Sequence, residues 1–491
     1  MKPLANKSFI LVSSICMLSL LILFCCMFRF ASPYAGTFDS VDFALALSRY
    51  DLLAMQPHFP GYPYFILGGM LIHQFIDNPV QALGVFNVLM MVGAMVPVYL
   101  LCRRNCSRID SVLLVTVVMT ASYVSVFVTQ PMSEGAALAV LWWYFWSLQK
   151  AAESKKQLDK ILPLFLFSIL MGIRLSYLPF GFGIVLLWWN EWRQSTSSGR
   201  IRKIMLYIII LIVFQLIWIM GVAMTEDGIV GFMKLGISFA MGHFTEWGGT
   251  AVSDSNVPVY GRILHLIFTN LIWTGLSASS IILLILYVSL VLFFLLNKGY
   301  KKNSIHPWVK VMGIIYFIWA LFGQNVDKPR HILPLIGITM LFLLIPLLKI
   351  KRKKISYLII CLLTLVQTYV GTELIKQQGT QPPATYQLAT YLEQKSKTEQ
   401  FIIYTWEEAR IMDYLKSTYY YKEIFTYDYF LQDKNMYPNK KVYVTDHVLK
   451  GFEAQGMNIK NSVKKVAEFN SNQLFDPIYG EIILYEWIDS K

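Results

Sequence analysis

The sequence predicts an α-helical polytopic membrane protein of about eleven spans, N-terminus inside and C-terminus outside, with a small extracytoplasmic α/β domain at its C-terminal end. Of its 491 residues, 56% are hydrophobic and 15% are charged, whereas soluble domains carry about 25% charged residues. The charge is divided unevenly. Residues 1–371 hold 29 bases and 14 acids, and residues 372–491 hold 14 bases and 16 acids. We therefore predict a transmembrane region over 1–371 and a water-soluble domain over 372–491.

Apolar stretches of about 20 residues mark the predicted spans. The stretch 161–189 is interpreted as a hairpin of two short helices with its outer tip at 172–179, because both of its flanks are basic and should be cytoplasmic. The other nine predicted spans are 9–28, 80–101, 111–129, 134–149, 204–224, 266–297, 311–324, 331–348 and 355–372.

The distribution of basic residues predicts the orientation of these spans. The inferred inner segments hold 22 bases and 4 acids, and the inferred outer segments before residue 372 hold 7 bases and 10 acids. Membrane proteins concentrate Lys and Arg in this way on the cytoplasmic side. The net charge of +13 therefore reflects sidedness, and no nucleic-acid partner is expected.

Two outer loops and the C-terminal domain complete the predicted architecture. The first outer loop, 29–79, is expected to contain interfacial segments rather than a clean helix, and the second covers 225–262. An outward-facing site would be built from these loops. The C-terminal domain alternates helical and strand patterns, which is typical of α/β folds. Helices are predicted at 384–396 and 406–419, and strands at 401–405, 423–427, 441–445, 463–469 and 481–487.

Two carboxylates of the first outer loop are candidates for catalysis. Asp39 and Asp42 are three residues apart and share one face if the segment is helical. One could take a proton from an attacking hydroxyl as a general base, while the other orients it or holds a cation. A divalent metal ion would suit the pair, although the sequence offers no third ligand. The structural alternative is a capping box with Asp39 as the N-cap and Asp42 at N3.

A proline-rich turn follows in the same loop. Three prolines and a glycine within residues 56–63 impose a rigid, non-helical path. His58 inside such a turn is a candidate for binding a phosphate or a sugar. The alternative is a connecting turn into the next apolar segment.

Several charged groups are expected at the outer ends of later spans. Lys328, Arg330 and His331 lie in a short outer loop, against the usual positive-inside bias, and arginine suits bidentate phosphate binding. Arg174 lies at the tip of the predicted hairpin. For Lys328, Arg330 and Arg174 the alternative is interfacial snorkelling. Glu134 lies at the outer start of a predicted helix. The structural alternative is that the positive end of the helix dipole simply stabilises its negative charge.

Four motifs lie at the predicted outer face: Asp39-Ser40-Val41-Asp42, His58-Phe59-Pro60-Gly61-Tyr62-Pro63, Pro131-Met132-Ser133-Glu134 and Lys328-Pro329-Arg330-His331-Ile332-Leu333-Pro334. In this order they resemble outer-face motifs of the GT-C superfamily of membrane glycosyltransferases, and are most similar to bacterial relatives of the protein O-mannosyltransferases. The proline-rich turn is the most specific of the four. Phe59 replaces its first usual proline, and His331 stands where tyrosine is usual.

The resemblance implies a multi-pass enzyme of the cell membrane that transfers a hexose or pentose, with inversion, from a polyprenyl-phosphate donor. The acceptor at the outer face, whether lipid, glycan or protein, is left open. By this resemblance Asp39 matches the catalytic acid, with Asp42 as the alternative, and Lys328 and Arg330 would hold the donor phosphate. The remaining predicted substrate-binding residues are His58, Tyr62, Glu134, Arg174 and His331.

Other functional classes remain as alternatives. A transporter or flippase of lipid-linked saccharides often shows internal repeats, and the sequence contains none that we can identify. A polysaccharide polymerase would also act on lipid-linked sugars at the outer face. A non-catalytic membrane scaffold is the third alternative, with the C-terminal domain binding a partner.

Overall fold

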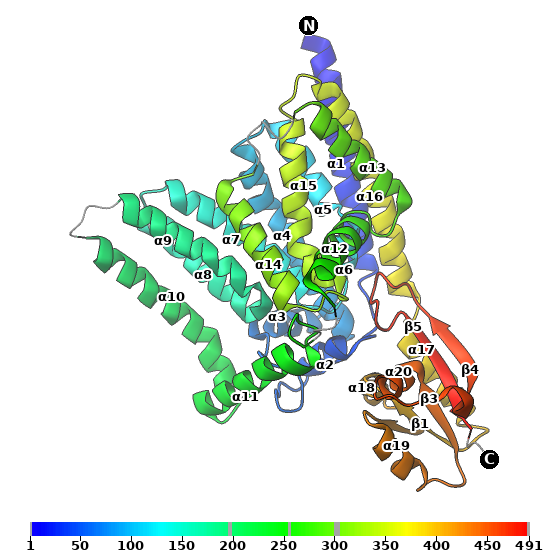
Figure 1. Ribbon diagram of the computed structural model, residues 1–491. Coiled ribbons are helices and arrows are strands. Elements are labelled where there is room, and N and C mark those ends of the chain that lie inside the picture. Colours follow the sequence, from blue (N-terminus) through cyan, green and yellow to red (C-terminus); the bar gives the residue numbers. More distant parts are fainter. Residues whose placement is uncertain (1, 195–198, 254–256, 299–304, 489–491) are drawn as a thin grey trace.

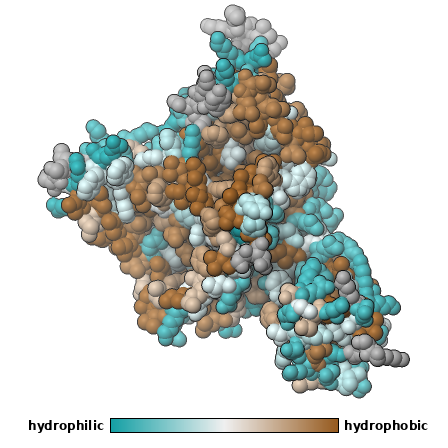
Figure 2. All heavy atoms as spheres, in the orientation of Figure 1, coloured by the Kyte–Doolittle hydropathy of each residue, from teal (hydrophilic) through white to brown (hydrophobic). Residues whose placement is uncertain are grey.

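The computed structural model describes residues 2–194, 199–253, 257–298 and 305–488. It consists of a large helical bundle and a C-terminal α/β domain attached at one end of the bundle (Figure 1). The first helix begins at the other end, so the chain starts far from the C-terminal domain. Figure 2 shows hydrophobic residues gathered over the helices and hydrophilic residues over much of the C-terminal domain.

The helical part is that of a multi-pass membrane protein. Within the described residues, five helical segments are long and apolar enough to cross a membrane, or seven if each bent pair counts as one span. The count of eleven spans and their orientation stay predictions. The helices are α1 (Lys2–Arg29), α2 (Phe38–Ala46), α3 (Pro63–His73), α4 (Pro79–Arg103), α5 (Arg108–Met119), α6 (Ser122–Val128), α7 (Glu134–Glu153), α8 (Gln157–Ile173), η1 (Leu175–Gly181), α9 (Phe182–Gln194), α10 (Arg200–Ala223), α11 (Gly228–Gly242), η2 (His243–Trp247), α12 (Val259–Leu264), η3 (His265–Leu276), α13 (Ile281–Leu296), α14 (Pro307–Gly323), η5 (Pro329–Ile332), α15 (Leu333–Leu347) and α16 (Lys353–Thr380).

Two predicted spans are broken in the structure. The stretch 266–297 is not one helix, because the segment ending with η3 and helix α13 meet at 111°. Ala278 and Ser279 between them have positive φ angles of 47° and 54°. The stretch 111–129 is divided into α5 and α6, which meet at 62°. Both breaks lie within uncharged runs, so a hydropathy pattern alone does not reveal them.

The first outer loop contains more helix than expected. It holds α2 and α3, which are separated by the proline-rich turn. The N-cap of α2 is Thr37, whose hydroxyl accepts a hydrogen bond from the Ser40 amide at 3.2 Å, while the Ser40 hydroxyl accepts one from the Thr37 amide at 2.9 Å. The alternative that Asp39 caps this helix is therefore wrong, and the Asp39 carboxylate is available for other contacts.

The C-terminal domain has three layers. Its five strands pair in the order β2-β1-β3-β5-β4, with β2, β1 and β3 parallel and β5 and β4 antiparallel to their neighbours. Core residues of α17 and α18 cover one face of the sheet, and those of α19 and α20 cover the other. The elements are α17 (Ala384–Lys395), β1 (Phe401–Thr405), α18 (Glu408–Leu415), β2 (Tyr420–Glu423), α19 (Tyr427–Lys434), β3 (Lys441–Thr445), α20 (Asp446–Ala454), η6 (Lys460–Ser462), β4 (Val463–Asn470) and β5 (Glu481–Trp487).

Most of the predicted elements of this domain are confirmed, with one misplaced strand. The strands at 401–405, 441–445 and 481–487 coincide with β1, β3 and β5. The strand predicted at 423–427 is wrong, because β2 ends where that prediction begins. Helices α19 and α20 were not predicted, since each is only two turns long and follows a strand without a strong start signal.

The C-terminal domain packs on the first outer loop. Ile411 of α18 lies in a small apolar core with Val41 and Ala44 of α2. The Tyr386 hydroxyl of α17 accepts a hydrogen bond from the Ala35 amide at 3.0 Å. These contacts place α18 next to the helix that carries Asp39 and Asp42.

Two glycines of α4 should respond in opposite ways to alanine substitution. A Cβ at Gly84 would lie 2.8 Å from the carbonyl oxygen of Thr129, whereas a Cβ at Gly93 would meet nothing within 4 Å. We expect Gly84→Ala to lower the free energy of unfolding by about 1–3 kcal/mol through overpacking. Gly93→Ala should be neutral or stabilising by up to about 1 kcal/mol. Thermal unfolding in detergent tests both, and an equal or smaller loss for Gly84→Ala would contradict this packing.

Candidate functional site

Four charged side chains from distant parts of the chain form a buried charge cluster at the end of the bundle that carries the C-terminal domain. The cluster consists of Asp39 of α2, Glu134 of α7, Arg174 at the end of α8 and Arg330 of η5. The Arg330 Nη2 donates to Asp39 Oδ2 at 2.7 Å, and its Nε lies 3.6 Å from Glu134 Oε1. The Arg174 Nη2 lies 2.9 Å from the same Glu134 oxygen. The sequence motifs predicted these residues individually, and the fold brings them together.

Neighbouring polar groups hold the two central members of the cluster in place. Glu134 is the first residue of α7, after a turn fixed by Asn87 of α4. The Asn87 amide donates to the carbonyls of Gln130 and Met132 at 2.9 and 2.8 Å, and its oxygen accepts from the Ala136 amide at 2.9 Å. The Arg174 Nη1 donates to the Ser133 hydroxyl at 2.9 Å. Asn87 was not predicted, because an isolated asparagine in a span carries no motif.

Burial makes the pairing within the cluster energetically necessary. The side chains of Glu134, Arg174 and Arg330 are 1%, 10% and 12% exposed. A buried charge without a partner is strongly destabilising, so two carboxylates and two guanidinium groups balance each other here. Only Asp39 remains substantially accessible, with 30% of its side chain exposed.

Arg330 also controls the ionisation of Asp39. Burial by itself would raise the pKa of Asp39, but the positive charge of Arg330 outweighs it, with help from Lys328. The pKa of Asp39 is therefore held well below its ordinary value. The carboxylate is ionised at neutral pH, and its basicity depends on its ion pair with Arg330.

Asp42 has a different set of partners from Asp39, although only three residues separate them. Its side chain is fully buried. His58 Nδ1 lies 3.1 Å from Asp42 Oδ2, and the Nε of Arg410 donates to Asp42 Oδ1 at 3.0 Å. The described residues contain no group of three or more His, Cys, Asp or Glu side chains arranged to hold a metal ion.

The proline-rich turn carries two of the predicted binding residues. His58 Nε2 lies 2.8 Å from the Tyr62 hydroxyl, so both ring nitrogens of His58 have protein partners. Phe43 packs edge-on against the Tyr62 ring at 4.8 Å, and Phe239 of α11 stacks on the His58 ring at 6.2 Å. The second outer loop thus covers the turn. In this conformation neither nitrogen of His58 is available to a ligand.

Lys328 and His331 flank Arg330 in the loop that contains η5. Lys328 is half-buried, and its charge acts on both Asp39 and Glu407. Its ammonium forms no ion pair with any residue that the structure describes. His331 is half-buried as well, and its carbonyl accepts a hydrogen bond from the Tyr316 hydroxyl at 3.0 Å.

The C-terminal domain contributes site residues that the sequence did not reveal. Arg410 of α18 reaches Asp42 across 368 residues of chain. Glu407, just before α18, accepts a hydrogen bond from the Tyr479 hydroxyl. Burial raises the pKa of Glu407, although the Tyr479 hydrogen bond and Lys328 oppose it. Nothing in the local sequence marks these residues, because their role depends on how the domain docks.

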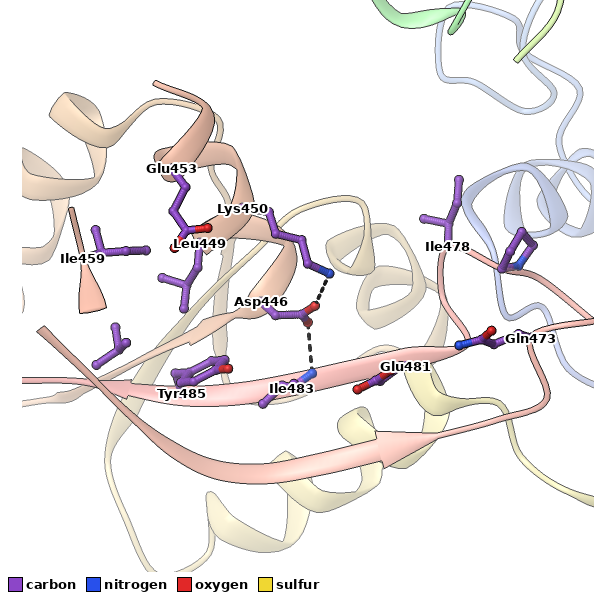
Figure 3. A pocket seen from close by; sticks show the side chains of 12 residues that line it. Asp446, Leu449, Lys450, Glu453, Ile459, Gln473, Ile478, Glu481, Ile483 and Tyr485 are labelled. Carbon is purple, nitrogen blue, oxygen red and sulfur yellow. Dashed lines mark hydrogen bonds and ion pairs between the residues drawn. The ribbon is translucent and has the colours of Figure 1, made fainter. Parts of the chain in front are cut away.

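Two cavities lie near or within this domain. A small one of about 80 Å³ runs between the first outer loop and the C-terminal domain, beside Thr37 and Tyr479. A larger one of about 590 Å³ lies between α20 and β5 (Figure 3). There Asp446 accepts hydrogen bonds from Lys450 at 2.6 Å and from the Ile483 amide at 2.9 Å. Only residues of the C-terminal domain line the larger cavity, so it is separate from the charge cluster.

Comparison with known proteins identifies the fold. No protein-family profile and no curated protein sequence matches this chain. The structure is similar to that of ArnT from Cupriavidus metallidurans bound to undecaprenyl phosphate, with a TM-score of 0.56, 11% identity and 98% of each chain covered. The apo state of that ArnT gives a TM-score of 0.46 at 12% identity, again over 98% of each chain. The apo oligosaccharyltransferase of Archaeoglobus fulgidus gives 0.48 at 12% identity, over 88% of this chain and 69% of that one.

The predicted resemblance to the GT-C superfamily is thereby confirmed as a likeness of fold. The ArnT comparison carries this conclusion, since it covers nearly all of both chains. At 11% identity the comparison concerns the path of the chain and leaves the chemistry to be argued from the residues of the site.

The charge cluster should contribute far more to stability than a surface ion pair on the same helix. Glu134→Gln would leave two buried guanidinium groups facing one carboxylate, which should cost about 3–5 kcal/mol of unfolding free energy. Glu153, also on α7, pairs with Arg104 and is 57% exposed. Glu153→Gln should cost less than about 1 kcal/mol. Thermal unfolding of both variants in detergent is the measurement, and equal losses would contradict the role assigned to Glu134.

Proposed function

We propose that this protein is a glycosyltransferase that moves a sugar from a polyprenyl-phosphate donor to an acceptor hydroxyl at the outer face of the cell membrane. The main support is the contact between the partly exposed carboxylate of Asp39 and the guanidinium of Arg330. A guanidinium is a cation well suited to binding phosphate. This contact lies in a fold shared with ArnT, which has been solved with undecaprenyl phosphate bound. The transferred sugar is a pentose or hexose, and the acceptor is a lipid, glycan or protein.

Arg330 and Lys328 are the proposed ligands of the donor phosphate. The planar guanidinium of Arg330 suits two phosphate oxygens at once. Lys328 lies two residues away and forms no ion pair with a described residue, so its charge is available to an incoming anion. When phosphate engages Arg330, Glu134 keeps its partner, because Arg174 remains 2.9 Å away. The cluster can therefore accept an anion without leaving a buried carboxylate alone.

Asp39 is the proposed general base. The acceptor oxygen attacks the anomeric carbon, the bond from that carbon to the phosphate oxygen breaks, and polyprenyl phosphate leaves with the electron pair. The acceptor proton passes to Asp39, and a single displacement of this kind inverts the anomeric carbon. Binding of the donor phosphate to Arg330 weakens the ion pair of Asp39 and makes its carboxylate more basic. Asp42 is less suited, since its side chain is fully buried.

The base assignment leads to a direct test. Asp39→Asn should reduce sugar transfer about 10²–10⁴-fold, because the acceptor loses its proton acceptor. Radiolabelled polyprenyl-phosphate monosaccharides, supplied as a panel with a total membrane extract as the source of acceptor, provide the assay. Asp51→Asn is the matched control, since Asp51 is an acid of the same loop whose partner Arg49 lies at the surface.

The outcomes of this assay separate the two acids. Normal transfer by Asp39→Asn together with an inactive Asp42→Asn variant would move the base to Asp42. Normal transfer by both variants would contradict an acid-assisted mechanism in this loop. Every variant that is compared must have an intact fold, which is checked by its thermal unfolding in detergent.

The donor-site assignment can be tested without knowing the sugar. Arg330→Ala should raise the Kd for undecaprenyl phosphate at least about tenfold, because a charge-assisted hydrogen bond contributes about 1.5–3 kcal/mol. Binding is measured with the purified protein in nanodiscs. Arg49→Ala is the control, since the Arg49 side chain is 70% exposed and lies outside the cluster. An unchanged Kd for Arg330→Ala would contradict the assignment.

The same preparation distinguishes the alternative functions. Transfer from monosaccharide donors supports the proposal, whereas transfer only from lipid-diphosphate oligosaccharides would indicate a polymerase. Movement of a lipid-linked saccharide across a proteoliposome membrane, without any transfer, would indicate a transporter or flippase.

A further inference from the structure

A continuous line of hydrogen bonds connects the C-terminal domain with the interior of the first outer loop. It runs from Arg410 through Asp42 and His58 to Tyr62. The successive heavy-atom distances are 3.0, 3.1 and 2.8 Å. Each contact joins two side chains, so a change of charge at one end alters the hydrogen-bonding direction at the other.

Arg410 is fixed firmly at its end of this line. Besides its Nε bond to Asp42, its Nη2 lies 2.9 Å from the same carboxylate oxygen. The same nitrogen also donates to the carbonyls of Ala54 and Met55 at 3.1 and 3.0 Å. Its guanidinium lies over the Phe38 ring at 5.6 Å. The side chain is only 18% exposed and Asp42 is fully buried, so this is a desolvated ion pair between two parts of the chain.

The charge of Arg410 determines which form of His58 fits the site. Nδ1 faces the Asp42 carboxylate, an acceptor, so Nδ1 must carry a hydrogen. Because one guanidinium already balances the one carboxylate, a second positive charge on His58 would be in excess. The neutral imidazole with hydrogen on Nδ1 satisfies the geometry. Its Nε2 then has a lone pair, which accepts a hydrogen bond from the Tyr62 hydroxyl.

This arrangement gives the Tyr62 hydroxyl a defined direction. Burial raises the pKa of Tyr62, so the phenol keeps its proton. That proton is directed toward His58, which leaves the oxygen lone pairs for the other side. The charged groups that also influence the pKa of Tyr62 are the four members of the charge cluster, Arg174, Asp39, Glu134 and Arg330. The phenol oxygen is therefore left to accept a hydrogen bond on the side away from His58.

We propose that Arg410 is a positioning residue through which the C-terminal domain sets the direction of the Tyr62 hydroxyl. Arg410 neutralises Asp42, Asp42 selects the neutral Nδ1–H form of His58, and His58 takes the Tyr62 hydrogen bond. Without Arg410, the buried Asp42 carboxylate has no guanidinium to balance it, and a positive charge on the adjacent His58 ring would supply the missing counter-charge. The imidazolium then donates from both nitrogens, and the Tyr62 proton turns away from His58.

The protonation state of His58 tests the proposal directly. The full chain, labelled with ¹⁵N-histidine and reconstituted in nanodiscs, is studied by NMR at pH 7, where ¹⁵N shifts distinguish the two neutral tautomers from imidazolium. The protein has seven histidines, and a His58→Gln variant assigns the resonance. We expect the neutral Nδ1–H form in the wild type and imidazolium in Arg410→Gln.

Three further variants separate charge from packing. Arg410→Lys keeps the charge and should keep the neutral form, which also covers the case in which Arg410→Gln fails to fold. Asp42→Asn combined with Arg410→Gln removes both charges and should restore the neutral form. Arg49→Gln, which breaks an exposed ion pair of the same loop, should change nothing. Imidazolium in the wild type, or an unchanged neutral His58 in Arg410→Gln, would overturn the proposal.

The catalytic consequence rests on the proposed function and is measured separately. If the Tyr62 oxygen helps to orient groups at the cluster, Arg410→Gln should lower kcat for sugar transfer about 10- to 100-fold while the donor KM changes little. Arg410→Lys should recover much of this loss, which a purely structural role would not predict. Should the wild type transfer no sugar from any donor, the proposed function fails, and the NMR result still decides the role of Arg410.

Discussion

The need to pair buried charges organises the end of the helical bundle that carries the C-terminal domain. Glu134 is almost completely buried, and it is stable there only because Arg174 and Arg330 approach it. Arg330 in turn contacts Asp39. The start of α7, the end of α8, the loop containing η5 and helix α2 are thereby held in one arrangement. The same pairing leaves one carboxylate partly exposed next to a cation that suits phosphate.

The C-terminal domain takes part in this arrangement through the first outer loop. Its helix α18 packs on α2 through Ile411, and Arg410 enters the loop to pair with Asp42. A fully buried carboxylate thus depends on a residue from the other domain. The two acids of α2, although close in sequence, belong to separate networks, one directed to the bundle and one to the C-terminal domain.

Sequence reasoning worked where local pattern and structure coincide. The strands β1, β3 and β5 follow their predicted limits because each is a short run of β-branched and aromatic residues bounded by polar segments. It failed for the break between η3 and α13, where an apolar run of membrane length conceals a change of direction. It also failed for Asn87 and Arg410, whose partners lie 43 to 49 and 368 residues away.

The membrane character of the chain, the separate C-terminal domain and the charged residues of the motifs all follow from the amino-acid sequence alone. Hydropathy, charge distribution and short motifs are properties of neighbouring residues, so they can be read without coordinates. Which of these charges meet depends on the tertiary structure. Asp39 pairs with Arg330 and Asp42 with Arg410 because helix packing and domain docking bring them within hydrogen-bonding distance, and no local pattern encodes a contact between segments hundreds of residues apart.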